Sequence, residues 1–366
     1  MKKMTMRPWN LKITQGYQPS IAILVPAYNE AKLIRLKLQN LKKIDYPSDK
    51  MNIVIINDAS TDNTLNEIET FKAQNPVLKL KIKVINNKEH AGKINCLNQA
   101  LKLVIDDLVI ISDADCFWPS DLLQKALKYL SDPSVGAVTA RELLLNTHDS
   151  WVTRGEQFYN KTVQTIRIGE SKIHSTIFFQ GGFAAYKRNL LQEFNHEIDD
   201  SGTALDIVQK NKRALLLPEI GFYTIFPSTW KNKVTLKLRR ASHLQHLLAK
   251  CGAMLLDGKL LLPKRIAIPE IFLHFFSPLF FIALAVLSAL VFTQYPLLFL
   301  VFLFFFGLLL CIEPARIIML ETLQSNLILL AALFFFVFGK RYILWINIQE
   351  SRILLTEELL NTRHLI

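Results

Sequence analysis

The sequence predicts an α/β domain with a parallel sheet, followed by a region of transmembrane helices. Three apolar runs of strand length each end in polar residues, and each is followed by a stretch with helical spacing of its apolar residues. Polar residues at the carboxyl ends of neighbouring parallel strands line the crevice in which such sheets bind nucleotides. In addition, the chain between Glu270 and Glu313 contains no Asp, Glu, Lys or Arg. That stretch is long enough to cross a hydrocarbon core of roughly 30 Å twice.

Strands and helices alternate through the first part of the chain. Such alternation implies right-handed crossovers between parallel strands. The expected strands cover 21–25, 51–56, 81–85, 108–112 and 135–141, and the expected helices cover 31–41, 61–75, 120–130 and 151–172. A further aromatic strand is expected over 178–186, where Gly181 and Gly182 indicate close approach of either a ligand or another part of the backbone.

A pair of carboxylates, Asp113 and Asp115, follows the apolar run 108–112. Two carboxylates one residue apart can bind a divalent cation that also binds diphosphate oxygens. An isolated pair of this kind is more often a simple turn. Here the other two runs also end in polar clusters, at 26–30 and 57–62, which favours a binding site at one edge of the sheet.

Further candidates lie near helix starts. The segment 90–101 becomes helical after Gly92, so Lys93 at its N-terminus could receive a diphosphate. Asp199 and Asp200 precede another helix, where they could act as an N-cap or as a general base. The basic segment 231–240 contains Arg239 and Arg240, which could meet a diphosphate leaving group, while its lysines could contact lipid headgroups.

The composition favours a membrane over nucleic acid as the partner. The formal net charge is +12, and most Lys and Arg residues precede the apolar region, as expected for a surface that stays in the cytosol. The polar N-terminal segment 1–19 lacks an apolar core of signal-peptide length. The 4 cysteines show no CxxC spacing, so reduced structural thiols are expected.

The number of membrane crossings stays open between two and four, with three favoured. Residues 293–296 form a natural turn between two spans, and the uncharged stretch between Glu321 and Lys340 is at the lower limit for a third. Three crossings would place Lys340, Arg341 and Arg352 outside, against the positive-inside tendency. The third segment could be re-entrant, an extra crossing could lie within 314–339, or the tendency could fail here.

Taken together, five motifs resemble, in order, those of family 2 glycosyltransferases, and the trailing apolar segments resemble the membrane-bound members related to cellulose and hyaluronan synthases. The motifs are 25–30, 57–62, 113–115, 180–183 and 199–200, within a resemblance that covers about residues 20–245. The resemblance implies a GT-A fold, which is the Rossmann-like fold of nucleotide-diphospho-sugar transferases. It also implies a UDP- or GDP-linked sugar donor, Mg²⁺ or Mn²⁺, and inversion of the anomeric centre in a single displacement.

The resemblance also implies roles for individual residues. The donor would be bound by Pro26, Ala27, Tyr28, Glu30, Asp58, Lys93 and Asp113, the metal by Asp115 and Asp113, and the acceptor by Gln180, Gly181, Gly182 and Phe183. Asp200 matches the general base, with Asp199 in place of the glutamate of the family motif. Arg239 and Arg240 are the candidates for the leaving diphosphate. The Gln-x-x-Arg-Trp motif of the synthases is represented at best by 237–241, without its glutamine and tryptophan, which argues against processive synthesis.

The expected function is therefore transfer of a sugar to a hydroxyl or phosphate of a membrane-associated acceptor, lipid-linked or a glycolipid. The expected location is the cell membrane, with several spans and a cytoplasmic catalytic domain, and no nucleic acid is expected to bind. A processive polysaccharide synthase, a nucleotidyltransferase, a non-catalytic nucleotide-binding scaffold and a transporter are the alternatives. The expected domains are an extension at 1–19, the catalytic domain at 20–240, an interfacial amphipathic segment at 241–268, the membrane region at 269–347 and a tail at 348–366.

Overall fold

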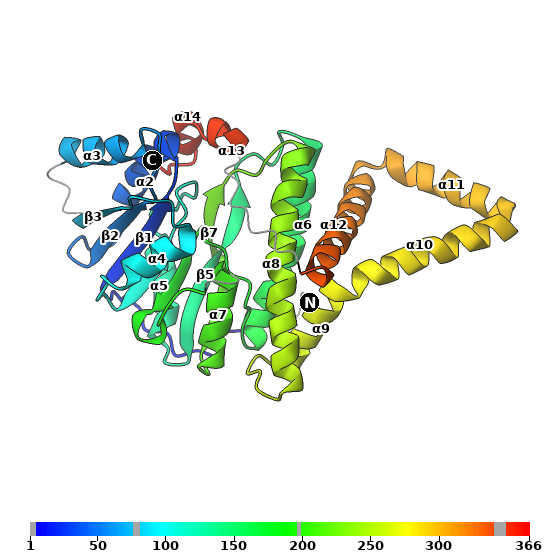
Figure 1. The fold of residues 1–366 in the computed structure, drawn as a ribbon, viewed down its shortest axis with the longest axis horizontal. Coiled ribbons are helices and arrows are strands. Elements are labelled where there is room, and N and C mark those ends of the chain that lie inside the picture. Colours follow the sequence, from blue (N-terminus) through cyan, green and yellow to red (C-terminus); the bar gives the residue numbers. More distant parts are fainter. Residues whose placement is uncertain (1–4, 76–80, 196–198, 340–348) are drawn as a thin grey trace. The chain divides into compact units, whose positions relative to one another are not determined.

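The computed structural model describes residues 5–75, 81–195, 199–339 and 349–366. The chain forms two compact units, which we call the sheet unit and the helical unit (Figure 1). The sheet unit comprises Met1–Leu145, Val163–Ile225 and Asn347–Ile366, and the helical unit comprises Asn146–Thr162 and Phe226–Ile346.

The sheet unit is built on a seven-stranded mixed sheet of strand order β3-β2-β1-β4-β6-β5-β7. The strands are β1 (Ile21–Ala27), β2 (Met51–Asn57), β3 (Lys81–Asn86), β4 (Leu108–Ile111), β5 (Val135–Leu144), β6 (Ala184–Lys187) and β7 (Arg213–Thr224). The first four strands are parallel, as expected, whereas β6 runs antiparallel to β4 and β5. All residues of β1 are buried, because helices cover both faces of a central parallel strand.

The helices of the sheet unit alternate with its strands up to α7, as expected, and two more lie in the tail. They are α2 (Ala31–Lys42), α3 (Thr64–Gln74), α4 (Lys93–Leu101), α5 (Leu122–Leu127), α7 (Asp199–Gln209), α13 (Gln349–Leu354) and α14 (Glu357–Asn361). Helix α6 (Trp151–Ile173) begins in the helical unit and ends in the sheet unit. Helix α2 shows how the pattern arises, since Leu33, Ile34, Leu38 and Leu41 recur at helical spacing and are all buried.

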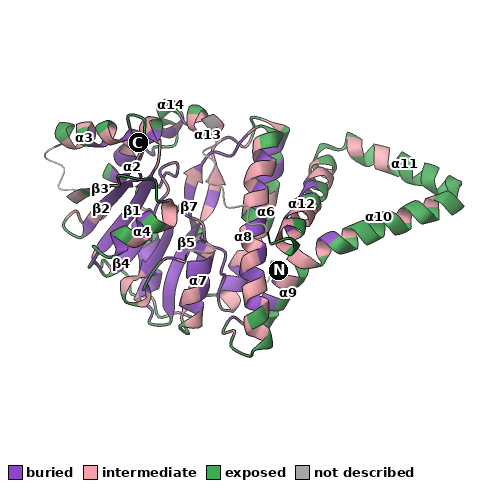
Figure 2. Ribbon diagram, in the orientation of Figure 1, coloured by how far each residue is buried: buried purple, intermediate pink, exposed green. Residues whose placement is uncertain are grey.

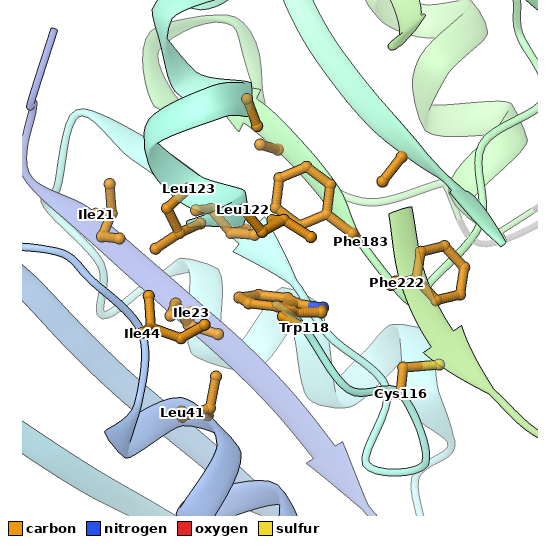
Figure 3. Packing of buried hydrophobic residues seen from close by; sticks show 14 of the residues in the cluster. Ile21, Ile23, Leu41, Ile44, Cys116, Trp118, Leu122, Leu123, Phe183 and Phe222 are labelled. Atoms are coloured by element: carbon orange, nitrogen blue, oxygen red, sulfur yellow. The ribbon is translucent and has the colours of Figure 1, made fainter. Parts of the chain in front are cut away.

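Trp118 lies in the core and connects the segment after the carboxylate pair with the turn at residues 181 and 182. Its indole ring packs edge to face against Phe183, with ring centroids 5.2 Å apart, and lies near Ile23 and Phe222 (Figure 3). Its Nε1 donates a hydrogen bond of 2.7 Å to the carbonyl oxygen of Gly182. Burial of a ring of this size stabilises the fold by roughly 2–3 kcal/mol. The segment after the carboxylate pair is thereby fixed to the turn that contains the two glycines.

The aromatic strand expected over 178–186 is much shorter than predicted. Only Ala184–Lys187 forms a strand, and residues 181 and 182 form a turn. A Cβ at Gly182 would lie 2.2 Å from the ring of Phe222. The close approach at Gly182 is therefore to a core side chain.

The helical unit contains α8 (Trp230–Leu256), α9 (Lys264–Phe275), α10 (Ser277–Gln294), α11 (Pro296–Cys311) and α12 (Glu313–Val337). Helix α8 runs through residue 240, where a domain boundary was expected. Helices α10 and α12 are long and apolar enough to cross a membrane, and α11 is apolar but shorter. The side chains of α10 and α11 are exposed along most of their length (Figure 2). Apolar surface of this extent on a helix pair marks an interaction site for lipid or for another protein.

A buried ionic cluster joins three helices of the helical unit. Lys233 Nζ on α8 lies 2.5 Å from Glu321 Oε2 on α12, and Lys237 Nζ lies 2.8 Å from Glu156 Oε2 on α6. The four side chains are nearly inaccessible to solvent. The sequence had suggested that the lysines of 231–240 contact lipid headgroups. These two lysines are buried and therefore do not. Their charges are instead compensated inside the unit.

Candidate active site

The carboxyl end of β1 leads into a loop at 26–30, which we call the donor loop. Asn29 adopts φ of 56° and accepts a hydrogen bond of 2.8 Å at Oδ1 from the backbone N–H of Thr61. The backbone N–H of Glu30 donates to Thr64 Oγ1 at 2.9 Å. Hydrogen bonds to the side chains of Asn29 and Thr64 thus join the loop after β1 to the segment after β2.

Asp58, the candidate for the nucleobase, organises the loop that precedes α4. Its carboxylate accepts hydrogen bonds of 2.8 Å from the backbone N–H groups of both Ala91 and Gly92, and one of 3.0 Å from Asn87 Nδ2. His90 Nδ1 lies 2.9 Å from Asp58 Oδ2. Burial acts to raise the pKa of Asp58, but the hydrogen bonds from Ala91, Asn87 and Gly92 outweigh this effect, so the pKa is lowered. The carboxylate therefore stays ionised and holds this loop in place.

Tyr28 and His90 bring the donor loop and the 87–92 loop into contact. Their ring centroids lie 4.1 Å apart. Gly92 has φ of 87°, a conformation that favours glycine, and it directly precedes Lys93, the first residue of α4. The two loops together position Lys93 at the N-terminus of a helix, where an anionic group is favoured.

Lys93 connects the two acidic motifs that the sequence singled out. Its Nζ lies 2.8 Å from Asp113 Oδ1 and 3.4 Å from Asp200 Oδ2. A Cβ at Gly181 would lie 2.3 Å from Lys93 Nζ and 2.6 Å from Asp113 Oδ2. Unlike Gly182, Gly181 therefore makes room for the functional side chains. The fold brings together residues from the loop after β4, from α4 and α7, and from the turn before β6.

The carboxylate pair fits a divalent cation. The ligand atoms of Asp113, Asp115 and Cys116 lie within 4.8 Å of one another. Burial and the charges of Asp115 and Asp113 raise the pKa of the Cys116 thiol well above its ordinary value, so the thiol stays protonated. Both carboxylates are partly exposed, as ligands for a metal that also binds a substrate must be. Oxygen ligands of this kind suit Mg²⁺ or Mn²⁺.

Sequence reasoning missed Lys37, which contacts the backbone directly after the carboxylate pair. It is fully buried, its Nζ donates a hydrogen bond of 2.6 Å to the carbonyl oxygen of Cys116, and it lies 4.5 Å from the centroid of the Trp118 ring. Burial lowers the pKa of Lys37 to about 7. Its position within the apolar stripe of α2 was the available signal, because a surface lysine belongs on the opposite face.

Sequence reasoning also missed Arg352 as a partner of the donor loop. The guanidinium binds Glu30 in a bidentate manner, with Arg352 Nε donating to Glu30 Oε2 at 2.9 Å. Burial raises the pKa of Glu30 to about 7, against the lowering effect of Arg352, and the charges of Asp115 and Asp113 add to the rise. No local pattern could reveal this pair, since the two residues are 322 positions apart.

The remaining candidates lie at different depths. Asp200 is buried in the first turn of α7, whereas Asp199 begins α7 and its side chain lies outside the described residues. Gln180 Nε2 lies 3.5 Å from Glu142 Oε2. Phe183 is fully buried in the core, so it supports the turn and presents no surface to a ligand. Arg239 and Arg240 lie on α8 in the helical unit.

Comparisons with known proteins match both the sequence and the fold. Residues 22–194 match the profile described as glycosyl transferase family 2. A mannosyltransferase from Pyrobaculum calidifontis, solved in complex with GDP-Man and Mn²⁺, is 32% identical with a TM-score of 0.76, and the match covers 93% of each chain.

Two curated relatives match over shorter regions. A beta-monoglucosyldiacylglycerol synthase from Synechocystis sp. is 33% identical over 140 residues, which are 38% of this chain and 28% of that protein. A poly-beta-1,6-N-acetyl-D-glucosamine synthase from Staphylococcus aureus is 34% identical over 127 residues, which are 34% of this chain and 29% of that protein. The matched region spans less than a third of the length of these two relatives.

Proposed function

Because the chain belongs to glycosyl transferase family 2, we propose that it transfers one sugar from a nucleotide-diphosphate sugar to a hydroxyl or phosphate of a membrane-associated acceptor, either lipid-linked or a glycolipid. The observation that carries this proposal is the convergence of Lys93, Asp113 and Asp200. A candidate metal ligand and a candidate base thus lie 2.8 Å and 3.4 Å from the same lysine ammonium.

The geometry supports a single inverting displacement. Asp113 and Asp115 would hold a divalent cation, which when bound neutralises negative charge on the leaving diphosphate. Lys93 adds a second positive charge on the same side. Asp200 would take the proton of an acceptor hydroxyl while the bond between the anomeric carbon and the diphosphate oxygen breaks. Asp199, Arg239 and Arg240 remain candidates for supporting this step.

The donor pocket would consist of the donor loop and the 87–92 loop. Pro26, Ala27 and Tyr28 would line the nucleobase side, with Asp58 holding the wall of the pocket. The Pyrobaculum calidifontis neighbour, solved with GDP-Man and Mn²⁺, supports a GDP-sugar as the first donor to test and Mn²⁺ as the first metal. A UDP-sugar is the second choice.

The acceptor is proposed to be a membrane lipid. Apolar helices α10 and α12 and the name of the Synechocystis relative, a beta-monoglucosyldiacylglycerol synthase, support this choice. The name of the staphylococcal relative supports the alternative of a processive polysaccharide synthase. The absence of the glutamine and tryptophan of the acceptor-channel motif from 237–241 favours transfer of a single sugar.

We propose that the chain resides in the cell membrane with its sheet unit in the cytoplasm and that it crosses the membrane an even number of times. The tail 349–366 follows α10 to α12 in the sequence but packs within the sheet unit, so both belong on one side of the membrane. A cysteine introduced as Glu358→Cys, in a variant with Cys311→Ser, should react with a membrane-impermeant maleimide only after the cells are permeabilised. Labelling of intact cells would contradict this topology.

Release of nucleoside diphosphate from GDP- and UDP-sugars tests the function. Purified full-length protein in lipid should release the product from one donor with Mn²⁺, and EDTA should abolish the release. Asp115→Asn should lose metal-dependent release, Asp200→Asn should reduce turnover by about 10²–10⁴-fold while retaining donor binding, and the exposed Asp49→Asn should behave as wild type. Absence of release from every donor, with membrane extract present, would favour a non-catalytic scaffold.

A further inference from the structure

The carboxyl-terminal tail forms part of the wall of the donor site. Glu30 closes the donor loop, its side chain is 4% exposed, and the side chain of Arg352 that binds it is 10% exposed. The pair is bidentate, with two N–H groups of the guanidinium donating to the two oxygens of the carboxylate. A guanidinium held in this way has a fixed orientation, because its planar fork matches the carboxylate.

The guanidinium lies within electrostatic reach of the metal motif. Asp115 and Asp113 both act on the charge of Arg352, as does Glu30. The same two carboxylates act on Glu30. The charges of the candidate metal ligands thus act on Arg352, which contacts Glu30 of the donor loop, whereas Lys93 contacts Asp113 directly and lies 3.4 Å from Asp200.

The position of the tail is specified by packing on both flanks of the site. Leu355, Leu360, Leu365 and Ile366 are buried in one cluster with Leu33, Phe117 and Ile225. Leu33 lies in the first turn of α2, just after Glu30, and Phe117 follows the carboxylate pair. The tail thus rests on the elements that begin where the donor loop and the metal motif end.

A buried asparagine fixes the end of the tail to the metal motif segment. Asn40 Nδ2 donates to the carbonyl oxygens of Leu365, at 2.7 Å, and of Trp118, at 2.8 Å, while its Oδ1 accepts from the N–H of Trp118 at 2.9 Å. Thr356 caps α14 by accepting a hydrogen bond from the N–H of Leu359. These contacts hold the tail in one place, and α13 then presents Arg352 to Glu30.

We propose that Arg352 is a donor-binding residue, supplied by the carboxyl-terminal tail, that binds a phosphate oxygen of the metal-bound diphosphate of the sugar donor. This inference rests on the proposed function. Phosphate offers the same paired oxygens as the Glu30 carboxylate, so the guanidinium can bind it while Glu30 still orients the group. As the bond from the anomeric carbon to the diphosphate oxygen breaks, the electron pair stays on that oxygen, and Arg352 stabilises the charge without a proton transfer.

Binding of nucleotides to full-length protein in detergent tests the proposal without requiring turnover. Calorimetry with Mn²⁺ compares GDP with GMP, and UDP with UMP, for wild type, Arg352→Gln, Arg352→Lys and the control Arg363→Gln, which alters an exposed arginine of the same tail. Arg352→Gln should weaken binding of the diphosphate about tenfold or more and binding of the monophosphate much less. Arg352→Lys should recover part of the loss, and Arg363→Gln should match wild type.

The possible outcomes separate this inference from the proposed function. Equal weakening for diphosphate and monophosphate, or no weakening, in Arg352→Gln protein that unfolds at the wild-type temperature would overturn the role of Arg352 and leave the donor site intact. Failure of wild type to bind any of the four nucleotides would overturn the proposed function itself, and this inference with it. Selective loss for the diphosphate, with steady-state donor KM rising more than kcat falls, would establish it.

Discussion

Lys93 Nζ lies 2.8 Å from Asp113 Oδ1, so the candidate metal ligand is paired with an ammonium group of the same chain. The same Nζ lies 3.4 Å from Asp200 Oδ2 and thereby bridges the metal motif and the candidate base. The ammonium reduces repulsion between the two carboxylates and places positive charge where the leaving diphosphate is expected.

Lys93→Met should lower kcat by about 10²-fold, because a preorganised cation is lost from the leaving-group side. Mn²⁺ should bind the variant at least as tightly as wild type in the absence of nucleotide, since Asp113 loses a competing cation. Nucleotide release and Mn²⁺ titration measure the two effects. Lys102→Met, which alters an exposed lysine at the carboxyl end of the same helix, serves as the control. A variant with wild-type kcat would exclude a role in catalysis.

Gly181→Ala should reduce activity with little change in stability. The added Cβ would meet the ends of the flexible Lys93 and Asp113 side chains, which can move apart at the cost of their pairing. Gly182→Ala should instead lower the unfolding temperature, because its Cβ would meet the buried ring of Phe222. Gly252→Ala, with its nearest neighbour atom 3.9 Å away, is the control. Activity and thermal unfolding of the three variants separate the two roles; equal losses of stability at 181 and 182 would contradict them.

Hydrophobic periodicity was sufficient to predict most of the sheet unit. The parallel order β3-β2-β1-β4 follows from alternating strands and helices, and the loops after β1, β2 and β4 meet at one edge, as parallel strands require. The antiparallel β6 was not predictable, because its direction depends on pairing with β4 and β5 rather than on local pattern.

The candidate site was predictable only where motifs are local. The carboxylates Asp113 and Asp200 are found close to Lys93 because each directly follows a strand or begins a helix. Arg352 is contributed by a segment beyond the apolar helices, and its pairing with Glu30 arises from tertiary packing alone. Likewise, Lys233 and Lys237 were interpreted as surface charges because their acidic partners lie on other helices.

Glu321→Gln should destabilise the helical unit by about 3–5 kcal/mol, because it leaves the buried ammonium of Lys233 without its nearest charge partner. Glu313→Gln on the same helix should cost less than about 1 kcal/mol, since its pair with Arg154 is largely exposed. The combined change Lys233→Met and Glu321→Leu should recover much of the loss. Thermal unfolding in detergent measures all three, and equal effects of the two glutamine variants would contradict burial of the cluster.

Lys37→Met should change how stability depends on pH. Burial lowers the pKa of Lys37 in the folded protein to about 7, below the ordinary value of 10.5. Between these two pH values the unfolded chain holds a proton that the folded protein lacks, so the free energy of unfolding of wild type rises with pH. The slope from this group is at most about 1.4 kcal/mol per pH unit and vanishes well below pH 7.

Replacement of Lys37 by methionine removes this contribution and the hydrogen bond to Cys116. The stability of wild type relative to Lys37→Met should therefore increase from about pH 6 to about pH 9. Denaturant unfolding of the full chain at several pH values measures the difference, with the exposed Lys32→Met on the same helix as the control. If the difference in the free energy of unfolding between wild type and Lys37→Met stayed constant across this range, Lys37 would keep its proton in the folded protein. The buried ammonium next to the metal motif would then be charged throughout.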